Sequence, residues 1–188
     1  MNFNKHSELA GKHAFLSGSN YHWLNYTTDR LCEVWRNASA KIMGTKLHEF
    51  AKDAINLHRP LMENGDTVSM YVNDCIYHGL SPEVTLYYSR NAFGTADGIS
   101  FDNDKLKIYD LKTGKHPASM KQLMIYAAFF CLEYEINPND IPIELRIYQS
   151  GEIVVYEPEP EEIWDIIDIL IAFDNIVSEM SPSNGDDL

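Results

Sequence analysis

The sequence predicts an α/β protein in which a mixed central sheet is flanked by helices and preceded by an N-terminal helical segment. Two observations lead to this prediction. Apolar residues recur at the three- and four-residue spacing of helices up to about residue 80, and after Pro82 they alternate as in extended strands. The strands are interrupted by one helical segment and followed by another, an order that is typical of a sheet covered by helices.

Four helices are expected before the sheet. A short helix lies within residues 17–26, and a second begins at Thr28 and buries Trp35. The third, over 44–58, has the clearest pattern. Its apolar face consists of Gly44, Leu47, His48, Ala51, Ala54, Ile55 and His58. The fourth covers residues 68–76.

The second half of the chain supplies the strands. Runs rich in β-branched and aromatic residues predict five of them, over 83–89, 94–101, 105–110, 142–149 and 152–156. A helix over 117–134 separates the third strand from the fourth, and a helix over 161–177 follows the fifth. We therefore expect the strands to form a single mixed sheet.

The length of 188 residues suits a single domain, 1–188. Within it we expect a helical part over 17–80, a sheet core over 83–157, and an acidic helix and tail over 158–188. No apolar run approaches the ~20 residues of a membrane span, and the first residues lack the apolar core of a signal peptide. These features predict a cytoplasmic protein with no membrane partner.

The net charge of −13 is unevenly distributed. Residues 157–188 contain ten acidic residues and no Lys or Arg, whereas residues 1–156 contain eighteen acidic and fifteen basic residues. The acid excess therefore belongs to the C-terminal end, and a DNA partner, which Lys and Arg would bind, is not excluded. The acidic side of the last helix is typical of a solvated face, with a partner-binding or DNA-mimicking face as the alternative.

The three cysteines, Cys32, Cys75 and Cys131, are far apart and form no CxxC pair. This spacing predicts reduced core thiols rather than a zinc ribbon or a four-cysteine iron–sulfur cluster.

A tight hairpin joins the second and third strands. If Asn103 and Asp104 are its loop residues, Asp97 lies opposite Asp110 at the end of an apolar stripe. Like charges in that position are destabilising, and a divalent cation between them would remove the cost. Strand alternation places Lys112 on the face of Asp110, while Leu111 points away and leaves its carbonyl near the site.

An Asp-x-Lys pattern is common by chance, but here it has a specific context. Gly-Thr-Ala-Asp-Gly (94–98) precedes the hairpin, and Gln122 and Tyr126 follow one turn apart on a helix. His48 lies in the apolar stripe of a helix upstream. Taken singly, His48 is more typical of a satisfied core histidine, and Gln122 and Tyr126 of a helix surface and a core rim.

At these residues the chain resembles the PD-(D/E)XK nucleases, specifically the RecB-type branch that includes phage and bacterial exonucleases. In that family a helix supplies a His, one strand an Asp, the next strand Asp/Glu-x-Lys, and the following helix Gln-x-x-x-Tyr. The matching positions here are His48, Asp97, Asp110 with Lys112, and Gln122 with Tyr126. The segment His13-Ala14-Phe15-Leu16-Ser17, followed by Trp23-Leu24, is also similar to the start of phage members.

The resemblance covers roughly residues 13–150 and implies a restriction-endonuclease-like fold. Two departures are evident. The four cysteines of the iron–sulfur branch are missing, and residues 113–120 are shorter and less glycine-rich than in phage relatives. The resemblance implies a metal-dependent DNA exonuclease that hydrolyses phosphodiester bonds at linear duplex ends during recombination or DNA processing. Its location would be the host cytoplasm if a phage encodes the chain.

The resemblance also implies roles for individual residues. His48, Asp97, Asp110 and the Leu111 carbonyl would bind Mg²⁺ or Mn²⁺, since oxygen ligands suit both ions and an imidazole favours manganese. Asp97, Asp110 and Lys112 would be catalytic, with Lys112 orienting the attacking water or neutralising charge on the phosphate. The residues expected to contact DNA or support the site are Thr113, Lys115, Gln122 and Tyr126.

Several alternatives remain open at this stage. The chain could be an endonuclease of the same fold, or a non-catalytic DNA- or protein-binding or inhibitor module with an acidic tail. A single-strand annealing protein and a second copy of the chain are further candidate partners. Glu49 is expected on a solvated helix face, and Glu83 begins a strand near the site without an assigned motif position.

Overall fold

The computed structural model describes residues 7, 14–114 and 117–180, which fall into two compact units divided after Thr45. In the first unit, a short 3-10 helix, η2 (Tyr21–Asn25), is followed by the start of helix α1 (Thr28–Asn56). The Trp23 indole donates a hydrogen bond to a backbone carbonyl 3.0 Å away. Trp35 packs edge-on against another ring but is 53% exposed, so its predicted burial is wrong.

Helix α1 also corrects the prediction of two separate helices over residues 28–58. It is continuous from Thr28 to Asn56 and passes through Gly44. A single glycine costs a helix about 1 kcal/mol and does not end it, and the helix contains no proline. It ends as expected before Pro60, where His58 adopts a left-handed φ of 50°.

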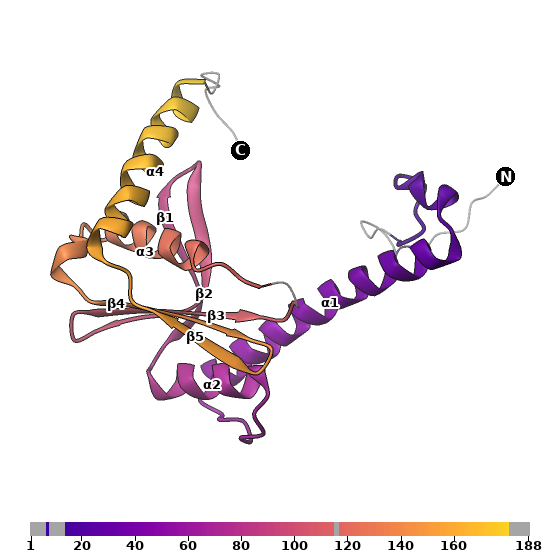
Figure 1. Ribbon diagram of the computed structural model, residues 1–188, viewed down its shortest axis with the longest axis horizontal. Coiled ribbons are helices and arrows are strands. Elements are labelled where there is room, and N and C mark those ends of the chain that lie inside the picture. Colours follow the sequence, from indigo (N-terminus) through magenta and orange to yellow (C-terminus); the bar gives the residue numbers. More distant parts are fainter. Residues whose placement is uncertain (1–6, 8–13, 115–116, 181–188) are drawn as a thin grey trace. The chain divides into compact units, whose positions relative to one another are not determined.

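The second unit contains a five-stranded mixed sheet with the strand order β1-β2-β3-β4-β5 (Figure 1). The strands are β1 (Ser81–Ser89), β2 (Ala92–Asp102), β3 (Lys105–Lys112), β4 (Ile143–Gln149) and β5 (Glu152–Tyr156). Strands β3 and β4 are parallel, and the other neighbouring pairs are antiparallel. The predicted α/β class with a mixed sheet is confirmed.

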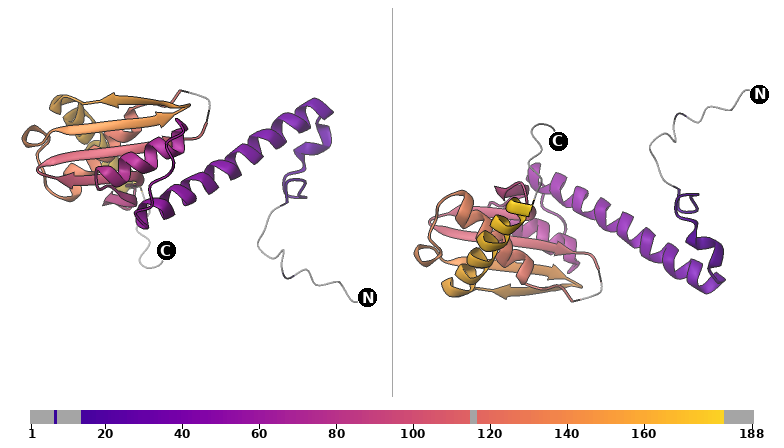
Figure 2. Two further views of the ribbon diagram at one scale, coloured as in Figure 1. Left: turned by 90° about the horizontal axis from the view of Figure 1, so that it is seen from below. Right: turned by 90° about the horizontal axis from the view of Figure 1, so that it is seen from above.

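The helices of the second unit cover both faces of the sheet. They are the end of α1, α2 (Thr67–Tyr77), α3 (Lys121–Glu133) and α4 (Pro160–Met180), with a short η3 (Pro138–Asp140) before β4. Helices α3 and α4 lie on one face and α2 on the other, as the opposite views of Figure 2 show. Helix α3 begins four residues later than the expected start at 117. Among the described helices, none is long and apolar enough to cross a membrane.

The β2–β3 hairpin has the predicted register. Phe101 pairs with Leu106 and Ile99 with Ile108. The loop residues Asn103 and Asp104 both have positive φ, 50° and 57°, which is the geometry that suits a two-residue hairpin turn.

Two apolar cores sandwich the sheet, and strand β3 contributes to both. Leu106 and Ile108 join the core beneath α3 and α4, whereas Tyr109 and Leu111 join the core beneath α2 and the end of α1. This alternation follows from the two-residue period of a strand. It places Asp110 on the α3 side of the sheet, at the end of the buried stripe.

Candidate metal centre

The Gly-Thr-Ala-Asp-Gly segment of β2 is shaped by packing on both sides of the sheet. A Cβ atom on Gly94 would lie 2.8 Å from the Tyr126 ring of α3, and one on Gly98 would lie 3.0 Å from the Tyr71 hydroxyl of α2. Both glycines therefore allow a helix to approach the strand closely. Asp97 lies between these two contacts.

Strand β1 is distorted where it passes Asp97. The pairs Pro82–Gly98 and Val84–Ala96 place Glu83 opposite Asp97. Glu83 has a φ of 54°, a left-handed conformation that costs a residue other than glycine about 1 to 3 kcal/mol. Such strain is common at functional sites, and here it occurs at a carboxylate that faces another carboxylate.

His48, Glu83 and Asp97 form a cluster in which one ligand atom of each lies within 4.8 Å of the others. The Nδ1 atom of His48 is 3.3 Å from Oδ2 of Asp97, and all three residues are partly buried. The hydrogen bond with Asp97 raises the pKa of His48, aided by the negative charges of the site and opposed by burial. An imidazole and two carboxylates at this spacing are a suitable ligand set for a divalent cation.

Asp97 also connects the cluster to β3. Its Oδ2 atom accepts a hydrogen bond of 3.0 Å from the backbone N–H of Leu111. The Leu111 side chain is fully buried in the core beneath α2, on the far side of the strand, as expected. The proposed use of its carbonyl as a metal ligand stays a prediction.

Asp110 is the most buried acid of the site, with 2% exposure. The Lys112 ammonium lies 3.0 Å from each of its carboxylate oxygens and donates a hydrogen bond to Oδ1. Among the described residues, Asp110 Oδ2 and the Ser100 hydroxyl are the buried side-chain polar atoms without a hydrogen-bond partner. Burial raises the pKa of Asp110 to about 6, and the charge of Asp97 contributes in the same direction.

These features test whether a cation fits the site. The buried Oδ2 of Asp110 accepts no hydrogen bond, which is unfavourable although the Lys112 ammonium lies 3.0 Å away. The charge of Asp97, which raises the pKa of Asp110, adds to the cost. A divalent cation would relieve both. The donor set of carboxylate oxygens and one imidazole suits Mg²⁺ or Mn²⁺, so the residues fit such an ion.

A relay of hydrogen bonds leads from Asp110 towards the surface. The Lys112 ammonium donates to Gln122 Oε1 at 2.8 Å, and Gln122 Nε2 donates to the Tyr126 hydroxyl at 2.9 Å. Gln122 and Tyr126 are one turn apart on α3, as their spacing predicts. The structure thus brings Lys112 of the Asp-x-Lys pattern into contact with the helix motif that follows it, and Lys112 in turn contacts Asp110.

Other sequence-based expectations have different outcomes. Thr113 follows β3 and is exposed, and Lys115 lies outside the described residues. Glu49 is exposed on α1, as expected. Glu83 is the site residue that the sequence analysis did not assign. The signal that could have found it is the β1–β2 register, which places it opposite Asp97.

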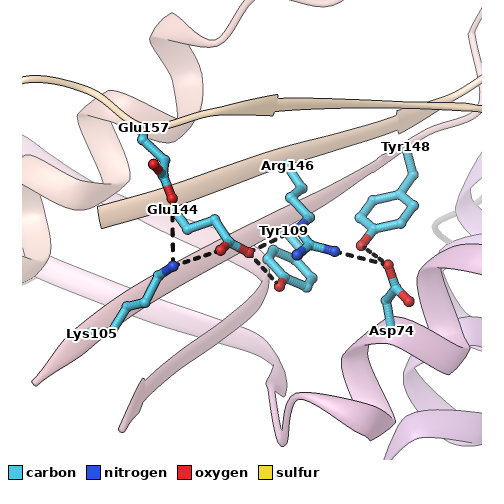
Figure 3. Close-up of polar contacts among 7 residues, drawn as sticks. All are labelled: Asp74, Lys105, Tyr109, Glu144, Arg146, Tyr148 and Glu157. Atoms are coloured by element: carbon cyan, nitrogen blue, oxygen red, sulfur yellow. Dashed lines mark hydrogen bonds and ion pairs between the residues drawn. The ribbon is translucent and has the colours of Figure 1, made fainter. Parts of the chain in front are cut away.

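A second polar cluster lies on the α2 side of the sheet (Figure 3). Glu144 accepts hydrogen bonds from Lys105, Tyr109 and Arg146 at 2.7 to 2.8 Å. Arg146 also donates to Asp74, which the Tyr148 hydroxyl contacts as well. Both carboxylates therefore have donors, and the cluster is a structural network. Asp110 differs because its buried Oδ2 accepts no hydrogen bond and its pKa is raised, although the Lys112 ammonium lies 3.0 Å from that oxygen.

Comparison of the chain with models of protein families gives no match, and comparison with curated proteins gives none either. The assignment of this site therefore depends on the geometry of its own residues.

Proposed function

We propose that the chain is a metal-dependent nuclease of the PD-(D/E)XK type, which hydrolyses phosphodiester bonds in DNA and acts as an exonuclease at linear duplex ends. The observation that carries the proposal is the buried Asp110 carboxylate, whose Oδ2 accepts no hydrogen bond, next to the cluster of His48, Glu83 and Asp97. The role in DNA recombination or processing and the restriction-endonuclease-like fold belong to the same proposal.

The arrangement of elements supports this proposal. An antiparallel hairpin places Asp97 and Asp110 on neighbouring strands, and α3 then crosses to the parallel strand β4. Helix α3 therefore lies beside the end of β3 and places Gln122 within hydrogen-bond distance of Lys112. His48 reaches the same end of the sheet from α1.

His48, Glu83, Asp97 and Asp110, with the Leu111 carbonyl, would hold Mg²⁺ or Mn²⁺. When bound, the cation would polarise the scissile phosphate and lower the pKa of an attacking water. The Leu111 N–H and His48 both contact the same oxygen of Asp97, so this carboxylate is held in a defined orientation before any ligand arrives.

Lys112 would provide the positive charge of the reaction. Asp110 and Gln122 hold its ammonium from two sides, which fixes its position at the end of β3. From there it can orient a water or offset the negative charge that develops on the phosphate. Tyr126 supports this arrangement, since its hydroxyl accepts from Gln122 while its ring packs over Gly94.

The test is to incubate the full chain with linear and with covalently closed duplex DNA, in Mg²⁺, in Mn²⁺ or in EDTA. We expect metal-dependent degradation of the linear DNA alone, and no degradation by Asp110→Asn. Cutting of closed circles would favour an endonuclease of the same fold. Failure to cut either DNA by a chain that binds Mn²⁺ would reject the nuclease and favour a binding module.

A further inference from the structure

Helix α4 exposes an apolar stripe along its outer side. The stripe consists of Ile169, Phe173, Ile176 and Met180, which are 55%, 63%, 51% and 78% exposed. Their spacing of four, three and four residues is that of side chains on one helix face, as in helices that pair with another helix. The buried residues Ile163 and Ile167 belong to a different face, which packs on α3. Helix α4 therefore has a second apolar face with no cover among the described residues.

The stripe lies beside a groove between α3 and α4. This groove has a volume of about 580 Å³, and Ile169 of the stripe lines it. Its other apolar lining residues are Met124, Ile125, Ile166 and Leu170. Further along, Phe173 lines a second hollow together with Phe93 of β2 and Val177. Figure 1 shows this part of α4 running alongside the β1–β2 hairpin, and the hydrogen bond between Ser89 and Asp174 holds it there.

A row of acidic side chains borders the stripe on the side away from the core. Glu161, Asp165, Asp168 and Glu179 are exposed, and their spacing along the helix places them on one side of the stripe. Like charges three or four residues apart repel one another. Residues 157–188 contain no Lys or Arg, and among the described residues Lys121 of α3 is the one basic residue that lines the groove together with Asp165. This side of α4 therefore combines exposed apolar surface with an excess of negative charge.

We propose that this surface docks a basic amphipathic helix of a protein partner. The apolar side chains of that helix would cover the stripe and enter the groove, and its Lys and Arg residues would face the acidic row. The proposal does not depend on the nuclease function, because it uses none of the metal-site residues.

The negative charge of the surface favours a basic helix over other candidate partners. DNA and anionic membranes would be repelled by the acidic row. A second copy that docked through α4 would bring two acidic rows together. Residues 181–188 contain two Asp and a single large apolar residue, Leu188, so this segment also lacks the required chemistry.

The probe for the test is a synthetic 18-residue peptide of Leu and Lys with Leu at helical spacing. A peptide of the same composition in shuffled order and a Leu–Glu peptide serve as controls. Titration with the full chain at physiological ionic strength, followed by fluorescence anisotropy, should give a dissociation constant in the micromolar range for the first peptide. Both controls should bind at least about tenfold more weakly. Equal binding of the shuffled peptide would overturn the proposal, because charge alone would then explain the binding.

Variants of the chain locate the binding. Ile169→Gln with Phe173→Gln should weaken binding about tenfold or more, and Asp165→Lys with Asp168→Lys should shift preference to the Leu–Glu peptide. As a control, Asp53→Lys with Glu63→Lys makes the same charge change at exposed positions outside α4. This control variant should keep most of the wild-type affinity for the Leu–Lys peptide. Thermal melts confirm that each variant folds.

Two results would reject the proposed partner. One is unchanged peptide binding by the chain carrying Ile169→Gln with Phe173→Gln, or an equal loss in the control pair. The other is a wild-type chain that sediments as a dimer while the variant with Ile169→Gln and Phe173→Gln sediments as a monomer. That result would show that the stripe binds a second copy of the chain.

Discussion

Replacing Asp110 by Asn should stabilise the metal-free chain at neutral pH while removing its ability to bind metal. Burial raises the pKa of this carboxyl from 3.8 to about 6, so the ionised form is disfavoured in the folded state. One pKa unit corresponds to about 1.4 kcal/mol, so the ionised carboxylate lowers the free energy of unfolding by up to about 3 kcal/mol. Asn keeps the shape and an acceptor for Lys112 without the charge. We therefore expect a gain of about 1 to 3 kcal/mol in EDTA at pH 7.5.

The sign of this effect sets its pH dependence. Because the folded-state pKa lies above the unfolded-state value, the penalty is absent below about pH 3.8, grows up to about pH 6 and is complete above it. The difference in stability between Asp110→Asn and wild type should therefore be largest at neutral pH and vanish near pH 4. For a chain of this length, 1 kcal/mol corresponds to about 2 to 4 °C in melting temperature.

The assay is urea or thermal unfolding of both proteins, in EDTA and with Mn²⁺. At a concentration one hundred times its dissociation constant, Mn²⁺ should stabilise the wild type by about 2.7 kcal/mol and the variant by much less. Two results would refute the reasoning. If Asp110→Asn is less stable than wild type in EDTA, the Asp110 carboxylate stabilises the fold. If Mn²⁺ stabilises both proteins equally, the ion binds at a site that does not include Asp110.

Three further predictions concern single residues. The Lys112→Ala variant should bind Mn²⁺ as well as wild type but cleave linear DNA on the order of 10²-fold more slowly, because the substitution removes charge stabilisation of the transition state. Near-normal cleavage by this variant at saturating Mn²⁺ would contradict the proposed role of Lys112. Glu83→Gln should weaken Mn²⁺ binding roughly tenfold or more in calorimetric titration. The control variant Glu49→Gln, on the exposed side of α1, should not change Mn²⁺ binding. Equal effects of the two substitutions would show that Glu83 is not a ligand. Burial opposes the charge of Glu144, but hydrogen bonds from Lys105 and Tyr109 outweigh the effect of burial and lower the pKa of Glu144 to about 2. The Glu144 carboxylate therefore stabilises the fold above pH 4.5, and this stabilisation is lost as the pH falls towards 2. Glu144→Gln should accordingly cost about 1 to 2 kcal/mol at pH 7, allowing for solvent screening, and an undiminished loss in unfolding experiments near pH 2 would show that the charge is not responsible.

The hairpin could be predicted from the sequence because its geometry is local. Asn103 and Asp104 tolerate positive φ, and once they are taken as the loop, the apolar alternation on both sides permits a single register. That register, with the two-residue period of the strands, places Asp110 and Lys112 on the same face. The Lys112–Gln122 contact needs only the further condition that α3 packs on this face.

The continuity of α1 could not be predicted in the same way. The apolar pattern weakens around residues 36–43, which is typical of a break between two helices when each helix packs on a core. In the structure, Trp35 and Ile42 are more than half exposed, so the large apolar side chains at either end of this stretch are not buried in a core. A helix without proline can continue through such a stretch on backbone propensity alone.

The side-chain direction of Glu83 could not be predicted from the alternation of residues along the strand. Its left-handed backbone interrupts the two-residue period, so its side-chain direction cannot be obtained by counting from its neighbours. The same interruption affects β2, where Gly94 faces α3 and Gly98 faces α2 although the two are an even number of residues apart. The position of Asp97 between them is therefore a property of the paired and bent strands.

The two polar clusters show how a functional site can be separated from a structural one. The network around Glu144 contains more ion pairs than the site around Asp110, yet its carboxylates have donors and the pKa of Glu144 is low. At Asp110 the pKa is raised, the buried Oδ2 accepts no hydrogen bond, and Glu83 of the adjoining cluster is held in a strained conformation. Each of these features opposes folding, and all three lie where His48 and Asp97 provide further ligands. A bound cation would stabilise the first two directly, since it adds further positive charge to that of Lys112 beside the carboxylates of the site.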